Sequence, residues 1–168
     1  KYLNFAADGE LSVVGSDAGA FKLKGRLSTA FDLLRRKTEM EAWGQLLNTR
    51  PGYFLRHHHG TVHWWDESFD FIQQLRLGGS LRLKDWGTAL TLQSATLKNY
   101  IYFDHTAFPQ QVSSPIQVLE GRIAHAYRWG ALGWEVEAAY QTSSNRTALP
   151  LPKLAAYGNL YLDFRLPS

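Results

Sequence analysis

The sequence of 168 residues contains no cysteine, which excludes disulfides and thiolate metal sites. It also lacks long apolar runs: the longest stretch without a polar side chain covers six residues, from Trp129 to Trp134. A membrane-spanning helix needs about 20 apolar residues, and no run approaches that length. A membrane β-barrel is not excluded, because strands that alternate between apolar and polar residues keep the mean hydropathy low.

Neither sign of charge dominates, since 18 basic and 15 acidic side chains give a formal net charge of +3. The basic residues alternate along extended segments instead of forming a patch, so we expect no nucleic-acid partner. Hydrophobic residues make up 45% of the chain, as in globular domains, and the length suits a single domain. We expect no nucleotide and no other cofactor.

The dominant pattern is an alternation with a period of two, which is typical of strands with one apolar and one wet face. In residues 21–32 the odd positions carry no charge, whereas the even positions carry four. A helix would mix the two sets on every side. The segment 69–84 repeats the pattern. Together with these two, the sequence predicts strands at 4–14, 40–48, 88–103, 119–129, 134–142 and 160–166, with a β-bulge near 94–97.

The connections between these strands are of two kinds, and the kinds alternate along the chain. Short turns are expected near 33–37, 85–87 and 130–131, and long loops at 49–68, 104–114 and 144–153. Short turns at one end and long loops at the other are typical of bacterial outer-membrane barrels. The sequence therefore predicts an all-β fold, an antiparallel up-and-down transmembrane β-barrel segment over residues 1–168.

Each predicted strand has a charge-free face and a charged face. Phe21 and Phe31 bound one charge-free face ten residues apart, which projects to roughly 25 Å at a tilt near 40°. We expect lipid against this face, at Phe21, Phe31, Phe69, Phe71, Leu75, Leu77, Tyr127, Trp129, Trp134 and Phe164. We expect a lumen to be lined by Lys22, Lys24, Arg26, Arg76, Arg82, Lys84, Arg122, Glu135, Glu137, Asp163 and Arg165.

Eight strands alone enclose an interior barely wide enough for their own side chains, and an aqueous channel needs about 16 strands. The chain also ends without a terminal aromatic residue. We therefore expect this chain to supply part of a wider wall, completed by the rest of a parent chain or by other barrel subunits. The alternative is a soluble β-sandwich, which shows the same alternation. Strands of 12 to 16 residues argue against it, because soluble strands average about 5–6.

Several motifs in a fixed order resemble one known family. They are Thr49-Arg50-Pro51-Gly52-Tyr53-Phe54-Leu55, His63-Trp64-Trp65-Asp66, Asn99-Tyr100-Ile101-Tyr102-Phe103, Pro109-Gln110-Gln111, Tyr140-Gln141-Thr142-Ser143-Ser144-Asn145, Leu149-Pro150-Leu151-Pro152 and Tyr157-Gly158-Asn159-Leu160-Tyr161. From about Leu11 to Phe164 the chain resembles the "putative porin" family of Bacteroidetes outer membranes. This resemblance implies a β-barrel in the outer membrane of a Gram-negative bacterium, with a porin role, in proteins several times longer than this chain.

The loop 49–68 contains the residues that are most suited to metal binding or catalysis. His57, His59 and His63 are candidate metal ligands or a pH-responsive group, because imidazole binds Zn or Cu and titrates near 6.5. The competing interpretation, loop side chains at the barrel rim, is favoured because consecutive residues of an extended chain point to opposite sides.

Other loop functions stay open as alternatives. Asp66, Ser68 and the histidines contain the residue types of a hydrolase triad, but no nucleophile elbow accompanies them. Trp64 and Trp65 could form a glycan platform, although interfacial anchoring is the more ordinary role of Trp. The loop 149–154 could bind a partner or pack on the rim. We therefore predict a passive channel for small polar solutes, with outer-membrane lipid as its surroundings and no enzymatic activity.

Overall fold

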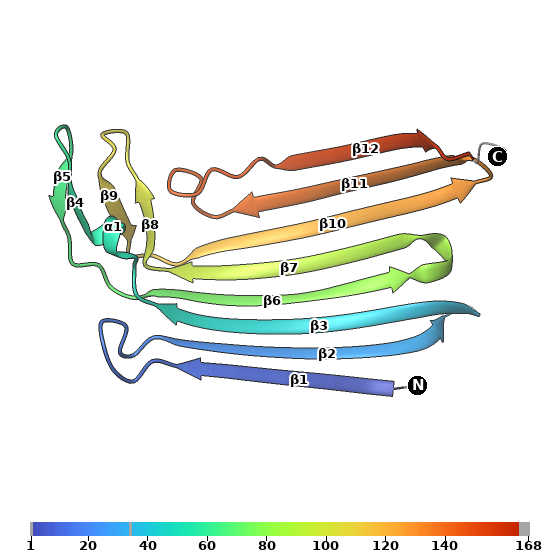
Figure 1. Ribbon diagram of the computed structural model, residues 1–168, viewed down its shortest axis with the longest axis horizontal. Helices are drawn as coiled ribbons and strands as arrows, with labels where there is room; N and C mark the ends of the chain where they lie inside the picture. Colours follow the sequence, from blue (N-terminus) through green and yellow to red (C-terminus); the bar gives the residue numbers. More distant parts are fainter. Residues whose placement is uncertain (1, 34, 165–168) are drawn as a thin grey trace.

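The structure is a computed structural model that describes residues 2–33 and 35–164. It is built around one eight-stranded antiparallel sheet whose strands lie side by side in chain order (Figure 1). The prediction of an all-β antiparallel fold with eight main strands is confirmed. These strands are β1 (Tyr2–Leu11), β2 (Phe21–Leu33), β3 (Arg36–Thr49), β6 (Ile72–Leu83), β7 (Thr88–Lys98), β10 (Ile116–Trp129), β11 (Leu132–Ser143) and β12 (Leu154–Leu162).

The connections at the two ends of the sheet differ in length. At one end β2–β3, β6–β7 and β10–β11 are joined by short turns, and β6–β7 includes the 3-10 turn η1 (Lys84–Trp86). Gly87 ends this turn at φ 59°, a left-handed conformation that suits glycine. The opposite end holds the longer connections. Those contain α1 (Tyr53–Arg56) and the small hairpins β4 (His57–His59) with β5 (Trp64–Asp66), and β8 (Tyr100–Phe103) with β9 (Pro109–Val112) (Figure 1).

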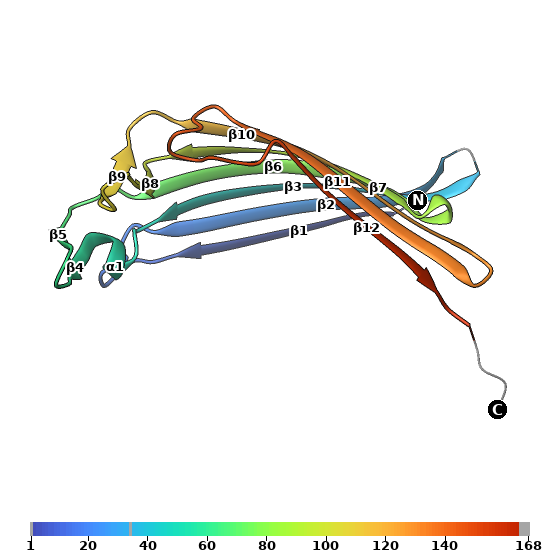
Figure 2. The ribbon, with the colours of Figure 1, turned by 90° about the horizontal axis from the view of Figure 1, so that it is seen from above.

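The sheet is curved and twisted, and it is open (Figure 2). Strand β1 pairs only with β2, and β12 pairs only with β11, so the two outer strands do not meet. The predicted barrel is therefore present as an antiparallel sheet that does not close on itself. Closure depends on partners for both edges, because an unpaired strand edge leaves backbone donors and acceptors unsatisfied.

Several sequence-based boundaries are wrong, and β3 and β10, for example, begin at Arg36 and Ile116 instead of 40 and 119. The bulge expected near 94–97 is absent, because β7 pairs without interruption with both β6 and β10. The strand instead ends at Lys98, and Asn99 takes a left-handed φ of 57° before β8 begins a separate hairpin. The last strand begins at Leu154 instead of 160, and the first covers Tyr2–Leu11 instead of 4–14. Alternation alone records which residues share a face, and it does not record where hydrogen bonding starts or stops.

Few side chains are buried, and the buried apolar ones lie near the long connections. Trp65, Ile101, Ile116 and Ala148 form this small core within the described residues. Over the sheet itself, by contrast, large apolar side chains such as Leu92 stay 68% exposed. In the described part of the chain, no second layer packs on the sheet to cover them. The fold is a single layer whose apolar surface needs an external partner.

A tight aromatic–glycine contact on the sheet yields the first prediction. A Cβ atom added at Gly78 would lie 2.4 Å from the ring of Trp43 on the neighbouring strand β3. We expect Gly78→Ala to displace this ring and to destabilise the folded protein by about 1–3 kcal/mol, as overpacking does. Urea unfolding of the full-length protein in detergent measures the effect.

The matched control is Gly25→Ala, because a Cβ atom at Gly25 meets no atom within 4 Å. This variant should keep its unfolding midpoint. Equal midpoints for the Gly78 and Gly25 variants would contradict the contact.

Candidate functional site

The pairing register determines which side chains share a face, because directly paired residues of neighbouring strands point to the same side. One face is apolar across the whole sheet, and we call it the apolar face. Both of its central rows run through all eight strands without a charged residue. The first row is Leu3, Thr29, Met40, Leu81, Leu90, Ile123, Ala138 and Ala156; the second is Phe5, Leu27, Ala42, Gly79, Leu92, Gly121, Tyr140 and Leu154.

The opposite side carries the charges, and we call it the charged face. The described residues that were expected to line a lumen and that lie on strands all share it: Lys22, Lys24, Arg26, Arg76, Arg82, Arg122, Glu135 and Glu137. Lys84, in η1, joins this face through an ion pair with Glu39 at 2.5 Å. Asp163 follows β12 and pairs with Arg128 at 2.8 Å. Arg165 lies outside the described residues.

Most of the residues expected to contact lipid lie on the apolar face. They are Phe21, Phe31, Leu75, Leu77, Tyr127, Trp129 and Trp134. Phe69 and Phe71 precede β6, and Phe164 follows β12, so their placement on strands was wrong. His125 also lies on the apolar face near the short turns. Its Nδ1 atom is 2.9 Å from the Thr88 hydroxyl, and its ring stacks over Tyr127.

Between β2 and β11 the aromatic residues near the ends of the apolar face are placed obliquely to the strands, whereas Phe5 of β1 lies inside the face, in the row of Tyr140. Towards the long connections the border aromatic is Phe21 in β2 but Tyr140 in β11, and Tyr140 shares a row with Leu27, six residues along β2 from Phe21. Towards the short turns the border aromatic is Phe31 in β2 and Trp129 in β10, which is shifted in the same direction. This drift, over the five steps from β2 to β11, is about one residue per strand. With about 3.3 Å per residue and 4.8 Å between strands it corresponds to a slope of about 35°, which lies within the tilt of barrel strands.

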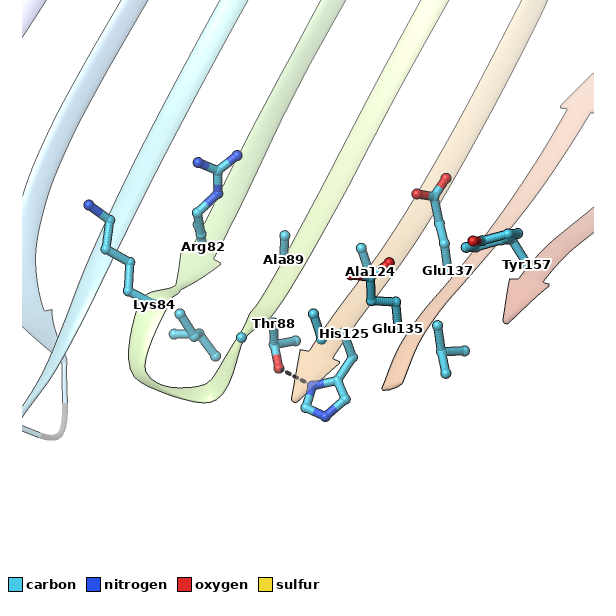
Figure 3. A pocket seen from close by; sticks show the side chains of 13 residues that line it. Arg82, Lys84, Thr88, Ala89, Ala124, His125, Glu135, Glu137 and Tyr157 are labelled. Carbon is cyan, nitrogen blue, oxygen red and sulfur yellow. Dashed lines mark hydrogen bonds between the residues drawn. The ribbon is translucent and has the colours of Figure 1, made fainter. Parts of the chain in front are cut away.

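The hollows of the sheet lie mainly on the charged face. In several hollows of the described structure, charged-face residues, with loop residues at one end, are the main lining. Figure 2 shows that the sheet which carries these hollows is curved. One hollow of about 420 Å³ lies near the short turns, and its side chains are drawn in Figure 3.

A larger hollow, about 650 Å³, lies at the other end, beneath the long connections. Loop residues line one side of it, namely Leu55, Ile101, Leu149 and Leu151. The charged face contributes apolar strand-end residues and, deeper along the strands, polar ones that include Arg76 and Glu120. Three connections therefore fold over the charged face and reduce the open space above this end of it. Sequence analysis missed this site, although Ile72, Leu97, Ile116 and Val118 at charged-face positions were an available signal.

The loop histidines are paired with a carboxylate and with aromatic rings. His57 contacts Asp66 directly, and His59 Nε2 lies 3.6 Å from Asp66 Oδ2. His63 lies apart from them, edge-on to Phe108. The described residues contain no group of three potential ligands that could hold a metal, and in these loops no hydroxyl is hydrogen-bonded to a histidine. The three metal candidates are thus not brought together.

Trp65 packs between the two loop hairpins and contacts both. Its indole Nε1 donates to the Leu55 carbonyl at 3.2 Å, and its ring stacks on His58 at 4.5 Å. Its other contacts are edge-on, to Phe103 and Phe108 of the second hairpin region, each at 6.0 Å between ring centres. Trp65 is buried, whereas Trp64 is 61% exposed. The two tryptophans therefore play different parts, one in packing and one at the surface.

An open, curved antiparallel sheet with one uncovered apolar face and one charged face places the chain among the all-β proteins. Residues 1–168 match the family described as "Putative porin", and the chain belongs to this family. The family resemblance seen in the sequence is confirmed. No curated protein and no solved structure matches the chain significantly. Among the residues described, no helix has the length and apolar character to cross a membrane.

The Asp66 cluster gives a prediction about pH. The hydrogen bond from His57 is the main cause that lowers the pKa of Asp66 from its ordinary value of 3.8. Because the folded state favours the ionised carboxylate, its contribution to loop packing is present above the ordinary pKa and is lost as pH falls through the lowered value. We expect acrylamide to reach Trp65 in the wild type only below about pH 4.

In Asp66→Asn, Trp65 should already be accessible at pH 7. The difference in fluorescence quenching between each protein and its Trp65→Phe version isolates this residue from the other tryptophans. Asp17→Asn, which removes an exposed loop carboxylate elsewhere, serves as the control and should behave as wild type. An Asp66→Asn protein with Trp65 still protected at neutral pH would show that the carboxylate does not hold the hairpin.

Proposed function

We propose that the chain forms part of the wall of an outer-membrane channel through which small polar solutes diffuse passively, without catalysis. The apolar face contacts lipid, and the charged face lines a water-filled lumen. The observation that carries this proposal is the uncovered apolar face with oblique aromatic borders. The porin-like role in general follows from membership of the family.

A soluble alternative has to cover the apolar face with protein. The largest apolar patch on a soluble monomer is about 300–600 Å², whereas this face extends over eight strands. Leu160 and Trp129, at 70% and 75% exposure, show how open it is near the short turns. Lipid satisfies this surface, because removing apolar area from water stabilises a protein by about 25 cal/mol per Å². The β-sandwich alternative lacks support, because in the described structure the only other sheets are the two-stranded hairpins β4–β5 and β8–β9, which do not cover the apolar face.

The charged face is suited to water. Its ion pairs stay partly exposed, as at Arg122 with Glu137 (3.2 Å) and Arg26 with Glu41 (3.4 Å). Burying such groups in an apolar medium is costly, so this side requires a hydrated space. Because acidic and basic groups are nearly balanced along the face, the proposed lumen discriminates weakly between small anions and cations.

The open edges suggest how the wall is completed. Within a bilayer each backbone donor and acceptor must be paired by protein, so the edges of β1 and β12 require further strands there. Eight strands are also too few for an aqueous channel. We propose that additional strands, from the same polypeptide or from other subunits, close the barrel.

A second candidate function belongs to the loops. Phe54 and Trp64 are 79% and 61% exposed, and both lie in the connection between β3 and β6. Exposed aromatic side chains favour binding of a glycan or a protein partner at the end with the long connections. This role is compatible with a channel, since it uses a different surface.

The assignment of faces is tested by charge insertion. Leu75 and Leu77 lie on the apolar face of β6, whereas Gln74 and Arg76 alternate with them on the charged face. We expect Leu75→Asp with Leu77→Asp to abolish stable insertion, because a charge at the bilayer midplane costs up to about 2–4 kcal/mol, with acids at the lower end. Urea-resistant association of the full-length protein with the outer-membrane fraction measures insertion.

The matched control is Gln74→Asp with Arg76→Asp, which adds the same number of carboxylates one position away. This variant should insert normally. If the leucine variant inserts as well as this control, the apolar face does not contact lipid.

The channel itself is tested by conductance. The full-length protein, reconstituted into planar bilayers, should give discrete ohmic current steps in KCl. Each step corresponds to one inserted channel, because ions cross an open, water-filled lumen in proportion to the applied voltage. A protein that inserts but produces no steps would favour the loop function over the channel.

A further inference from the structure

The hollow near the short turns has an apolar floor between charges of opposite sign. Its floor consists of Ala89, Ala124 and Ala126 on β7 and β10. Arg82 on β6 lies on one side of these alanines, and Glu135 on β11 lies on the other. Figure 3 shows the basic side chains and the acidic ones on opposite sides of Ala89 and Ala124. The small alanine side chains leave the middle of the hollow open.

Two further charges at the hollow are already neutralised. Lys84 pairs with Glu39 at 2.5 Å, and Glu137 pairs with Arg122 at 3.2 Å. In the part of the chain that the structure describes, neither Arg82 nor Glu135 has an ion-pair partner. One guanidinium and one carboxylate are therefore available to a bound molecule. They lie on opposite sides of the alanine floor, with Glu137 in the row of Arg82 and Glu135 two residues nearer the short turns.

The spacing of the strands sets the size of the molecule that fits. Strands β6 and β11 are separated by β7 and β10, and three spacings of about 4.8 Å place their backbones about 14 Å apart. Arg82 and Glu135 lie on the two strands that border this gap, which is wide enough for a solute of a few bonds in length. The hollow of about 420 Å³ lies within the size range of small-molecule sites.

We propose that this hollow binds small zwitterionic solutes of the short-peptide class. Arg82 takes the carboxylate of the solute, and Glu135 takes its ammonium group. A solute with a single charge can pair with only one of these two residues, whereas a zwitterion can pair with both. This inference rests on the proposed channel function and adds to it the class of solute for which the wall has a site.

The binding test uses alanylalanine with the full-length protein in detergent, followed by saturation-transfer NMR. N-acetyl-alanylalanine lacks the ammonium group, and alanylalanine amide lacks the carboxylate. We expect each analogue to bind about threefold to fivefold more weakly than the dipeptide, the effect of losing one exposed ion pair. Arg82→Gln should abolish the advantage of the dipeptide over the amide, and Glu135→Gln its advantage over the acetylated analogue.

The controls remove the same charges elsewhere on the charged face. Lys24 and Asp8 are paired neighbours on β2 and β1, far across the sheet from the hollow. Lys24→Gln and Asp8→Asn should leave the preference for the dipeptide unchanged. The double variant Arg82→Glu with Glu135→Arg keeps both charges in exchanged positions and should restore the preference.

Binding and conductance separate the two proposals. Dipeptide preference in a protein that gives no current steps would support this site and overturn the channel. Current steps together with equal binding of the dipeptide and both analogues would support the channel and overturn this site. A preference that survives both Arg82→Gln and Glu135→Gln would also overturn it, because the charges named here would not be the ones recognised.

Discussion

The rest of the structure depends on one geometric constraint, which is that alternation with a period of two is kept in register across eight neighbouring strands. Paired residues such as Leu46 and Leu75 point to the same side, so the apolar residues of separate strands merge into one continuous face. A slip of one residue in any strand would move its leucines to the charged face and its charges to the apolar one. The separation into two faces is therefore a property of the whole sheet.

This separation makes the sheet incomplete in two directions. The apolar face has no covering layer, and the outer strands β1 and β12 have no second partner in the described structure. Lipid against the face and further strands at the edges satisfy both needs at once, which is the arrangement of a membrane barrel. The oblique aromatic borders agree with it, because strands that tilt in a bilayer meet its surfaces at successively shifted positions.

Along the charged face the chemical character changes from end to end. Near the long connections, inward-folded loops place Leu55, Leu149 and Leu151 over the strands and make the surface partly apolar. Near the short turns the surface is open, and Arg82 and Glu135 keep free charges above a floor of alanines. A solute that crosses the proposed lumen from the end with the long connections first meets a narrower region with apolar sides. It then meets a region where a basic and an acidic side chain are both free.

The sequence by itself determined the strand class, the number of main strands, the face of those site residues that do lie on strands, and the family. These properties follow from local alternation, which a single strand already displays in residues 21–32. Only the tertiary structure decided the end of β7 at Lys98, the pairing of His57 with Asp66, the inward fold of the loops and which charges stay unpaired. Each of these depends on contacts between residues distant in the chain or on hydrogen bonds of the backbone, and a two-residue period contains no information about either.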